Sequence, residues 1–377
     1  TIKHSGKEGM SLVNDASNST ILGNSITDIG GSGIQVGHPQ HIYEGDDGTH
    51  EKYTSSVEGI CKNNTIRNNY IYSTTNLYLA HQAVSAYFVD TLAIEHNHIE
   101  GTNYGGVSIG WGWCEFDEVA FPSNPTTTCR NNKFNNNRVF DCMKTLHDSG
   151  AFYTIGAQPN SQANNNYVKA STTHFQGVYH PDEGTAWYTG SNLVFDIVPG
   201  QDNFELNDWK RKHDNHYDNI YSTSSAYQIG APNCTVTNLY VYPSSASFPQ
   251  AALDIISNAG LEAAYQYLLP GGATPSPTAP PTVEPTAVPT RIPGTALIAC
   301  GSGAAVGNFQ PDQYYTGGTA YNNTNTVDVS FITDNPPPAE LFNNERYGAM
   351  SYTIPGFTSG SSYEVTLYFA ETYLTSA

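Results

Sequence analysis

The chain has 377 residues, which is more than one hydrophobic core normally supports, so we expect at least two folding units. Its 15 Lys and Arg against 34 Asp and Glu give a formal net charge of −19, which argues against nucleic acid as a partner because phosphate would be repelled. No apolar stretch is long enough to cross a membrane, and the abundance of Asn, Gly, Ser, Thr and Tyr favours β-structure with many turns.

Residues 1–250 repeat a short signature in which an Asn precedes a short apolar pair. The copies begin at Asn24, Asn69, Asn97, Asn137, Asn166 and Asn192. They are 45, 28, 40, 29 and 26 residues apart, as expected of a solenoid with loops of variable length. Asn tolerates left-handed turn angles, and stacked Asn side chains can bond from rung to rung. The pattern predicts an all-β parallel β-helix whose β-branched residues point inward; an Asn-rich β-sandwich is the alternative.

The end of the first domain is marked by a change of periodicity. Residues 258–269 have the apolar spacing of a helix, and Asn258 is placed to cap its N-terminus. We expect this helix to close a domain of residues 1–269.

A proline-rich segment separates this domain from the rest of the chain. Pro recurs every fourth residue from Pro277 to Pro293, which predicts an extended linker at 270–294. Its Thr-Pro content resembles the linkers of secreted bacterial polysaccharide-degrading enzymes. Residues 295–377 form the next domain, where alternation at 363–371 predicts a half-buried strand.

The six cysteines show neither a CxxC pair nor zinc-binding spacing, so we predict no metal site from them. Cys114 and Cys129 bracket a polar loop and either form a disulfide or remain isolated thiols. The acidic segment 44–51 offers oxygen ligands for Ca²⁺ but lacks the spacing of a calcium loop. We interpret that segment as a solvated insertion and predict no cofactor.

Four segments in the first domain carry a resemblance to a known family. They are Gly-Gly-Val-Ser-Ile-Gly-Trp-Gly-Trp at 105–113, His-Asp-Ser-Gly-Ala-Phe-Tyr-Thr-Ile-Gly at 147–156, Gly-Val-Tyr-His-Pro-Asp-Glu-Gly at 177–184 and Asn-Ala-Gly-Leu-Glu at 258–262. In this order they resemble the right-handed parallel β-helix glycoside hydrolases, which include fucosidase, xylanase and xylosidase types. Pro181 departs from the family pattern, which has an aliphatic residue there. The resemblance implies a secreted enzyme, whose signal peptide would precede Thr1.

The last domain resembles a second family. Ala-Cys-Gly-Ser-Gly at 299–303, Arg-Tyr-Gly-Ala-Met-Ser-Tyr-Thr-Ile-Pro at 346–355 and Tyr-Glu-Val-Thr-Leu-Tyr-Phe-Ala-Glu at 363–371 are similar to malectin-type carbohydrate-binding domains. Such a domain needs more chain than 295–377, so we expect a partial, jelly-roll-like β-sandwich. The resemblance implies that Tyr347 and Tyr352 lie near a bound sugar; core packing is the alternative for Tyr352.

Two aspartates are the candidates for catalysis. Hydrolysis of a glycosidic bond needs one carboxyl to protonate the leaving oxygen and a second to attack, or to activate water. Asp148 and Asp182 stand in Gly-flanked motifs that align with one inserted residue, and Glu183 follows the second. Each Asp has a turn role as its alternative.

The register between the two motifs decides the reaction type. If the aligned aspartates occupy neighbouring strands, about 4.8 Å apart, the enzyme is retaining, with Asp148 as nucleophile and Asp182 or Glu183 as acid/base. If 150–153 stacks on 177–180 instead, the carboxyls lie further apart, toward the inverting range.

Aromatic residues and histidines near these motifs are candidates for sugar binding. Trp111 and Trp113 alternate with Gly, so both indoles would point to one side of a strand and leave room for a flat ligand; core or loop packing is the alternative. Further candidates are His81, His147, Tyr153, Tyr179 and Trp187.

We therefore predict a monomeric, secreted glycoside hydrolase that acts on a plant cell-wall or similar polysaccharide. A polysaccharide lyase or epimerase on the same fold is one alternative, but it needs cations to neutralise a uronate, and residues 140–200 contain only Lys144 and Lys169. A non-catalytic adhesin with a carbohydrate-binding solenoid is the other.

Overall fold

The computed structural model describes residues 1–38, 59–110, 127–172, 174–272, 296–329, 336–357 and 366–368. The chain divides into two compact units, Thr1–Pro277 and Thr278–Ala377, which we treat separately. The predicted linker lies outside the described residues from residue 273 onward.

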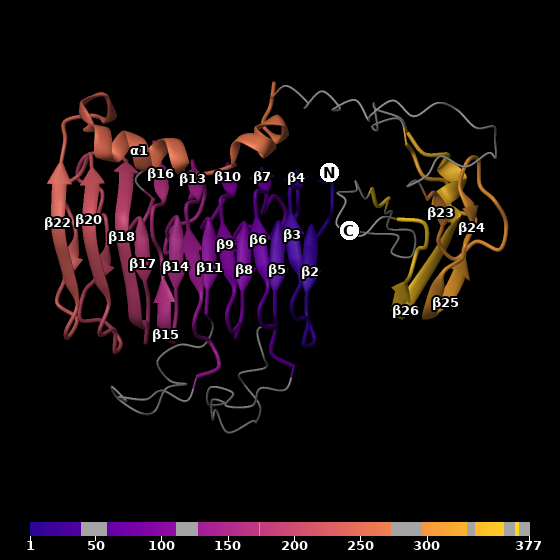
Figure 1. Cartoon of the computed structure of the whole chain (residues 1–377), viewed down its shortest axis with the longest axis horizontal. Helices are drawn as coiled ribbons and strands as arrows, with labels where there is room; N and C mark the ends of the chain where they lie inside the picture. The colour runs from indigo at the N-terminus through magenta and orange to yellow at the C-terminus, as the bar shows by residue number, and fades with distance from the viewer. Residues whose placement is uncertain are drawn as a thin grey trace, which may run out of the picture. The chain divides into compact units, whose positions relative to one another are not determined.

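The first unit is mostly β, and its short strands pair in parallel into long sheets (Figure 1). Across the largest sheet the order is β1 (Ile2–Lys3), β4 (Ser25–Thr27), β7 (Tyr70–Tyr72), β10 (His98–Glu100), β13 (Arg138–Phe140), β16 (Tyr167–Lys169), β18 (Ala186–Asp196), β15 (Ala157–Gln162), β12 (Lys133–Asn135), β9 (Ala93–Glu95), β6 (Thr65–Arg67) and β3 (Thr20–Leu22). Beyond β18 lie β20 (His216–Ser222) and β22 (Thr235–Val241).

A second parallel sheet lies alongside. It contains, in order, β17 (Tyr179–Pro181), β14 (Phe152–Thr154), β11 (Val107–Ile109), β8 (Val84–Ala86), β5 (Ile34–Val36) and β2 (Met10–Leu12). A bridge from Tyr179 to Phe204 leads on to the pair β19 (Glu205–Leu206) and β21 (Gln228–Ile229). Most strands therefore pair with the strand three elements along the chain, and strands that follow one another in sequence lie in different stacks of paired strands.

Identical positions of successive strands stack to form the core. Ile26, Ile71, Ile99, Val139 and Val168 are register partners from β4 to β16, and each has 0% of its surface exposed. Alternation in a three-residue strand turns the middle side chain inward here, which confirms the predicted inward placement of β-branched residues.

The asparagines of the repeat form a hydrogen-bonded ladder at the edge of this core. Each side-chain oxygen accepts from the backbone N–H of the preceding member, over 2.8–3.0 Å, from Asn24 through Asn69, Asn97 and Asn137 to Asn166. Side-chain amides also bond along the series. The predicted bonding of stacked asparagines is confirmed for these five positions.

Asn192 does not belong to this ladder. Tyr167 pairs with Val194, so the partner of Asn166 is Leu193 and Asn192 stands one position earlier. It bonds instead to Asn165 and Asn219. Its φ of +56° matches the left-handed angles of its register equivalents, which are Gly23, Asn68, His96, Asn136, Asn165, Asn219 and Asn238. The expected tolerance of Asn for left-handed turns is thus seen in a column next to the ladder.

The closing segment differs from the predicted helix. The short η2 (Ser245–Ser247) leads to α1 (Gln250–Asn258), so Asn258 ends this helix instead of capping the start of the next one. Gly260, with φ +83°, turns the chain, and a 3₁₀ helix, η3 (Ala263–Leu268), follows.

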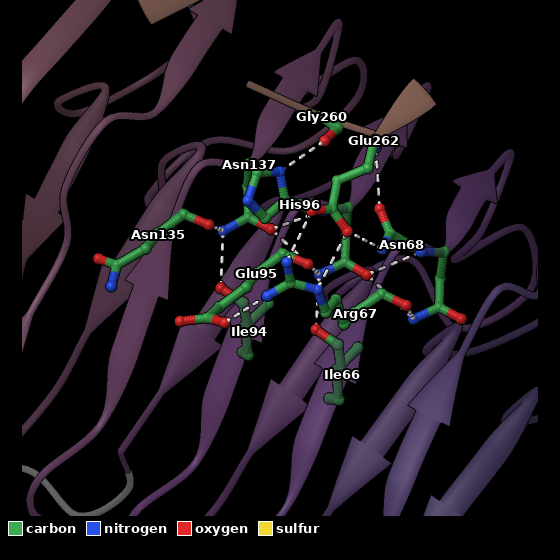
Figure 2. Close-up of polar contacts among 12 residues, drawn as sticks. Ile66, Arg67, Asn68, Ile94, Glu95, His96, Asn135, Asn137, Gly260 and Glu262 are labelled. Carbon is green, nitrogen blue, oxygen red and sulfur yellow. Dashed lines mark hydrogen bonds and ion pairs between the residues drawn. The ribbon is translucent and has the colours of Figure 1, made fainter. Parts of the chain in front are cut away.

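This segment is tied to the turns of three strands (Figure 2). Glu262 accepts hydrogen bonds from Arg67 at 2.8 and 3.2 Å, and it exchanges two bonds with Asn68. The carbonyl of Gly260 lies 3.2 Å from His96 Nδ1. Because the contacts involve residues almost two hundred positions apart in sequence, they join the end of the unit to its first half.

The second unit is a small β structure. It contains β23 (Ile298–Ala299), β24 (Gln310–Pro311), β25 (Tyr315–Asn322), η4 (Ala339–Asn343) and β26 (Asn344–Tyr352). β25 and β26 pair antiparallel. Of the strand predicted at 363–371, only 366–368 are described, so that prediction lies largely outside the described residues. Across the described parts of both units, no helix has the length and apolar content needed to cross a membrane.

Candidate functional site

A row of polar side chains projects from the outer face of the second sheet. Tyr153, in the middle of β14, is the register partner of His180 in β17. Glu205 opens β19 next in line, because Tyr179 bridges to Phe204. Their strand neighbours Phe152, Tyr179 and Phe204 point inward and have at most 1% exposed surface. Alternation thus separates three polar groups on the outside from three aromatic rings in the core.

Asp182 follows β17 directly and meets this row. The Tyr153 hydroxyl donates a hydrogen bond of 2.6 Å to Asp182 Oδ2, and His180 Nε2 lies 3.8 Å from Oδ1. Burial, together with the charge and hydrogen bond of Asp182, raises the pKa of Tyr153 well above its usual range. Tyr153 therefore stays a donor at neutral pH and holds the Asp182 carboxylate in one orientation.

Glu205 is held by a buried cation and a histidine. Its Oε2 lies 2.5 Å from His180 Nε2 and its Oε1 lies 3.5 Å from Lys212 Nζ. Lys212 is fully buried and also donates to Asn207 Oδ1 at 2.9 Å. Burial alone raises the pKa of Glu205, but His180, Lys212 and Asn207 outweigh it and lower that pKa to about 2.

This depressed pKa predicts an acid-dependent contribution of Glu205 to stability. Because the folded pKa of about 2 lies below the ordinary 4.5, the contribution is complete above about pH 4.5 and is lost as the pH falls toward 2. Its size is about 3 kcal/mol at most. We expect chemical denaturation at pH 7 and pH 3 to show a larger fall in the free energy of unfolding for the wild type than for Glu205→Gln. An equal fall in both proteins would contradict the assignment.

Asp148 stands at the exposed rim of the same site. Its backbone carbonyl accepts a hydrogen bond from the Tyr104 hydroxyl. Burial and then the charges of Asp148 and Asp182 raise the pKa of Tyr104 to about 12. The same two charges act on Tyr153. The two aspartates therefore share one electrostatic environment built around two phenols.

The strands pair in the second of the two registers that the sequence allows, in which 150–153 stacks on 177–180. Tyr153 pairs with His180, so Asp182 falls opposite position 155, whereas Asp148 precedes β14 by four residues. The alignment of Asp148 with Asp182 on neighbouring strands, on which the retaining prediction depended, is wrong. That alignment needed one inserted residue. An insertion shifts the strand register by one position and turns every side chain to the other face of the sheet.

Asp182 and Glu183 point to different neighbours. Asp182 contacts Tyr153, whereas Glu183 Oε1 accepts a bond of 3.3 Å from the indole N–H of Trp209. Their backbone forms a turn in which the Asp182 carbonyl accepts from Thr185 N–H at 2.9 Å and Gly184 has φ +69°. The turn that was the alternative to catalysis for Asp182 is present, and the side chain remains directed at the polar row.

The predicted sugar-binding residues have different fates. The prediction that Tyr179 binds sugar is wrong, because its side chain has 0% exposed surface and packs against Phe152, Phe195, Phe204 and Tyr217. Trp111 and Trp113 lie outside the described residues.

Three further candidates make their contacts with residues outside the polar row of Tyr153, His180 and Glu205. His147 is exposed and its ring centroid is 4.3 Å from that of His174. Trp187 is half-buried near the start of β18 with a φ of +61°, and its ring lies edge-on to His213 with centroids 4.7 Å apart. His81 lies 3.8 Å from Glu8 Oε1, and burial lowers its pKa. The sugar-binding roles of these three residues stay predictions.

In the second unit the two predicted tyrosines differ. Tyr347 is 53% exposed on β26. Tyr352 is half-buried and donates a 2.7 Å hydrogen bond to Asp312 Oδ1, while Arg346 Nε lies 2.7 Å from Asp312 Oδ2. Tyr352 thus takes part in a polar cluster with Asp312, Tyr347 is the more exposed of the two, and the sugar-binding role of both stays a prediction.

The remaining predictions from the sequence concern metal ligands and a disulfide. Within the described ranges, no three His, Cys, Asp or Glu side chains gather as metal ligands would. The acidic segment 44–51 and Cys114 lie outside those ranges. Cys129 is a free, buried thiol whose pKa is raised to about 12 by burial.

Sequence reasoning missed five residues of this site: Tyr104, His180, Glu205, Trp209 and Lys212. His180 was within the Tyr-His-Pro-Asp motif and follows from alternation, because its neighbour Tyr179 is apolar enough to enter the core. Glu205 and Lys212 carry no local signal, since their meeting with His180 depends on the register of the next strand.

Comparisons with known proteins were made for the whole chain. The family model of the malectin domain matches residues 295–377. A solved structure described as a glycoside hydrolase is similar to this chain with a TM-score of 0.47 and 22% identity, over 69% of this chain and 37% of that one. The chain thus spans 37% of the length of that structure. A search of curated proteins found no match.

Proposed function

We propose that the first unit is a right-handed parallel β-helix. Its support is the parallel pairing of strands three elements apart, the stacked core positions and the asparagine ladder. These are the features expected when each repeat buries its apolar face only against its neighbours.

We propose further that the protein is a glycoside hydrolase with its active site on the outer face of the second sheet. The observation that carries this is the gathering of Asp182, Asp148, Tyr153 and Tyr104, in which Tyr153 bonds to Asp182 and both carboxylates raise the pKa of both phenols. Two carboxyls that flank the scissile bond are the minimum for glycosidic hydrolysis. The malectin match at 295–377 supports a carbohydrate as the ligand, delivered to the site by an appended binding domain.

In this proposal the two aspartates have separate roles. Asp182 is oriented by Tyr153 and activates a water molecule, taking its proton as the water oxygen attacks the anomeric carbon. Asp148, at the open rim, is the general acid, which must bind a proton in the substrate complex and then gives that proton to the leaving glycosidic oxygen. In the observed register the two aspartates do not occupy facing positions on neighbouring strands. We therefore expect their carboxyls to lie roughly 6.5–9.5 Å apart, which is the range of inverting and not of retaining enzymes.

Lys212, the cation in contact with Glu205, is not available to neutralise a uronate, so a lyase or epimerase reaction here would depend on the exposed Lys210 beside Trp209. A lyase needs a cation that contacts the uronate of its substrate. Lys212 is the cation next to Glu205 and His180, but it is fully buried and bonded to Asn207. Its charge serves Glu205 and cannot reach a substrate. An adhesin is the remaining alternative, in which the bond from Tyr153 to Asp182 would serve structure alone.

The test is sugar release by the whole protein from xylan, pectin, and fucosylated and arabinosylated glycans in heavy-oxygen water. We expect new reducing ends that carry the heavy oxygen, with the inverted anomer seen first by NMR. Products with ultraviolet absorbance from a new double bond would establish a lyase. Binding without any release would establish an adhesin.

A further inference from the structure

Trp209 presents a flat apolar surface beside the candidate site. It lies in the loop between β19 and β20, and 55% of its surface is exposed. Tryptophan is highly buried on average, and an indole with more than half of its surface exposed is available to a ligand. Its position in the chain, three residues after β19, gave no signal at the level of the sequence.

The loop that carries Trp209 is joined to the turn that carries Asp182. The indole N–H donates to Glu183 Oε1 at 3.3 Å, and the backbone N–H of Gly184 donates to the Lys210 carbonyl at 2.8 Å. Lys210 Nζ also lies 5.7 Å from the centre of the Trp209 ring. The Glu183 bond uses the polar edge of the indole and the Lys210 ammonium lies over one ring face, so a ligand would stack on the other face.

We propose that Trp209 is a sugar-binding subsite that stacks on one pyranose ring of a glycan whose scissile bond lies at Asp182. This inference rests on the proposed function and adds the site of a neighbouring sugar. The C–H face of a pyranose needs a flat apolar partner, and an indole with its N–H already bonded supplies one. Because Glu183 directly follows Asp182, the platform adjoins the catalytic carboxylate.

Glu183 acts through Trp209 and is a positioning residue. Its side chain bonds to the indole, while the Asp182 side chain bonds to Tyr153. Gln at position 183 keeps an oxygen acceptor for the indole N–H, whereas Ala removes it. Glu183→Gln is therefore expected to retain the affinity for the glycan, and Glu183→Ala to lose part of it.

The test titrates the full chain with soluble hexasaccharides of xylose, arabinose and galacturonic acid, followed by tryptophan fluorescence, and measures kcat and KM for the hexasaccharide that is cleaved. We expect Trp209→Ala to raise both the dissociation constant and KM about tenfold, with kcat changed less than about threefold. Trp209→Phe keeps a flat ring and should stay within about threefold of wild type. Tyr240→Ala, which removes an exposed aromatic ring on β22, is the matched control and should leave the fluorescence response intact.

Equal titrations and equal KM in wild type and Trp209→Ala, or no fluorescence response to any of the three hexasaccharides, would overturn the subsite. If turnover is present and depends on Asp182 in that case, the proposed hydrolase stands without the subsite. If a response that needs Trp209 is seen without turnover, the subsite stands and the hydrolase is wrong.

Discussion

The Asp182→Asn variant is expected to release sugar about 10²- to 10⁴-fold more slowly than the wild type, the usual loss when a catalytic acid or base is removed. An amide at this position still accepts the hydrogen bond of Tyr153 but cannot take a proton from water. Stability should therefore stay close to that of the wild type, and kcat should fall with little change in KM. Asp148→Asn should cause a loss of similar size by removing the proton donor. Reducing-end assays on the whole protein, with thermal unfolding of each variant, measure both effects.

The matched control is Asp218→Asn on β20, whose exposed carboxylate accepts bonds from Thr237 and Asn238. We expect this control to retain full turnover. Turnover that survives Asp182→Asn but is abolished by Glu183→Gln would transfer the catalytic role to Glu183 and refute our assignment.

The Asn97→Gly variant is expected to lower the free energy of unfolding of the first unit by about 2–5 kcal/mol. Asn97 Oδ1 is the acceptor for the buried backbone N–H of Asn69, and its amide donates to Ile66 and Asn137. Glycine at this position leaves the Asn69 N–H unpaired in a fully buried place, which costs more than the loss of an exposed bond. Chemical denaturation followed by circular dichroism gives the value.

Asn192→Gly is the matched substitution in the neighbouring column. Its φ of +56° suits glycine, and its side chain is only half-buried, so we expect a change within about 1 kcal/mol. Equal losses in the two variants would mean that the ladder has no special role and that any asparagine of the repeat is equivalent.

The local features of the first unit follow from the residues themselves. Ile26, Ile71 and Ile99 recur in the middle of short strands, and burial of that position needs only the two-residue period of a strand. Asn69 and Asn97 likewise place a side-chain amide at a turn, so the same hydrogen bond can form in each repeat. Parallel pairing and stacked asparagines were therefore predictable from the sequence.

The site was predictable only in part. Asp148, Asp182 and Tyr153 were identified by their Gly-flanked motifs, and the structure brings all three to one face. The helix at 258–269 was misplaced, because Asn258 suits a helix end as well as a start and the apolar residues after it enter a 3₁₀ helix.

By itself, the sequence determined the strand repeat, the inward column, the turn residues and the malectin-like second unit, because these depend on residue type and on spacing within one repeat. Only the tertiary structure decided that Tyr153 pairs with His180, that Glu205 and Lys212 stand beside them, and that Trp209 adjoins Glu183. The physical reason is that register is set by the summed pairing of whole strands and by the lengths of the turns between them, and a slip of one residue moves every side chain to the other face.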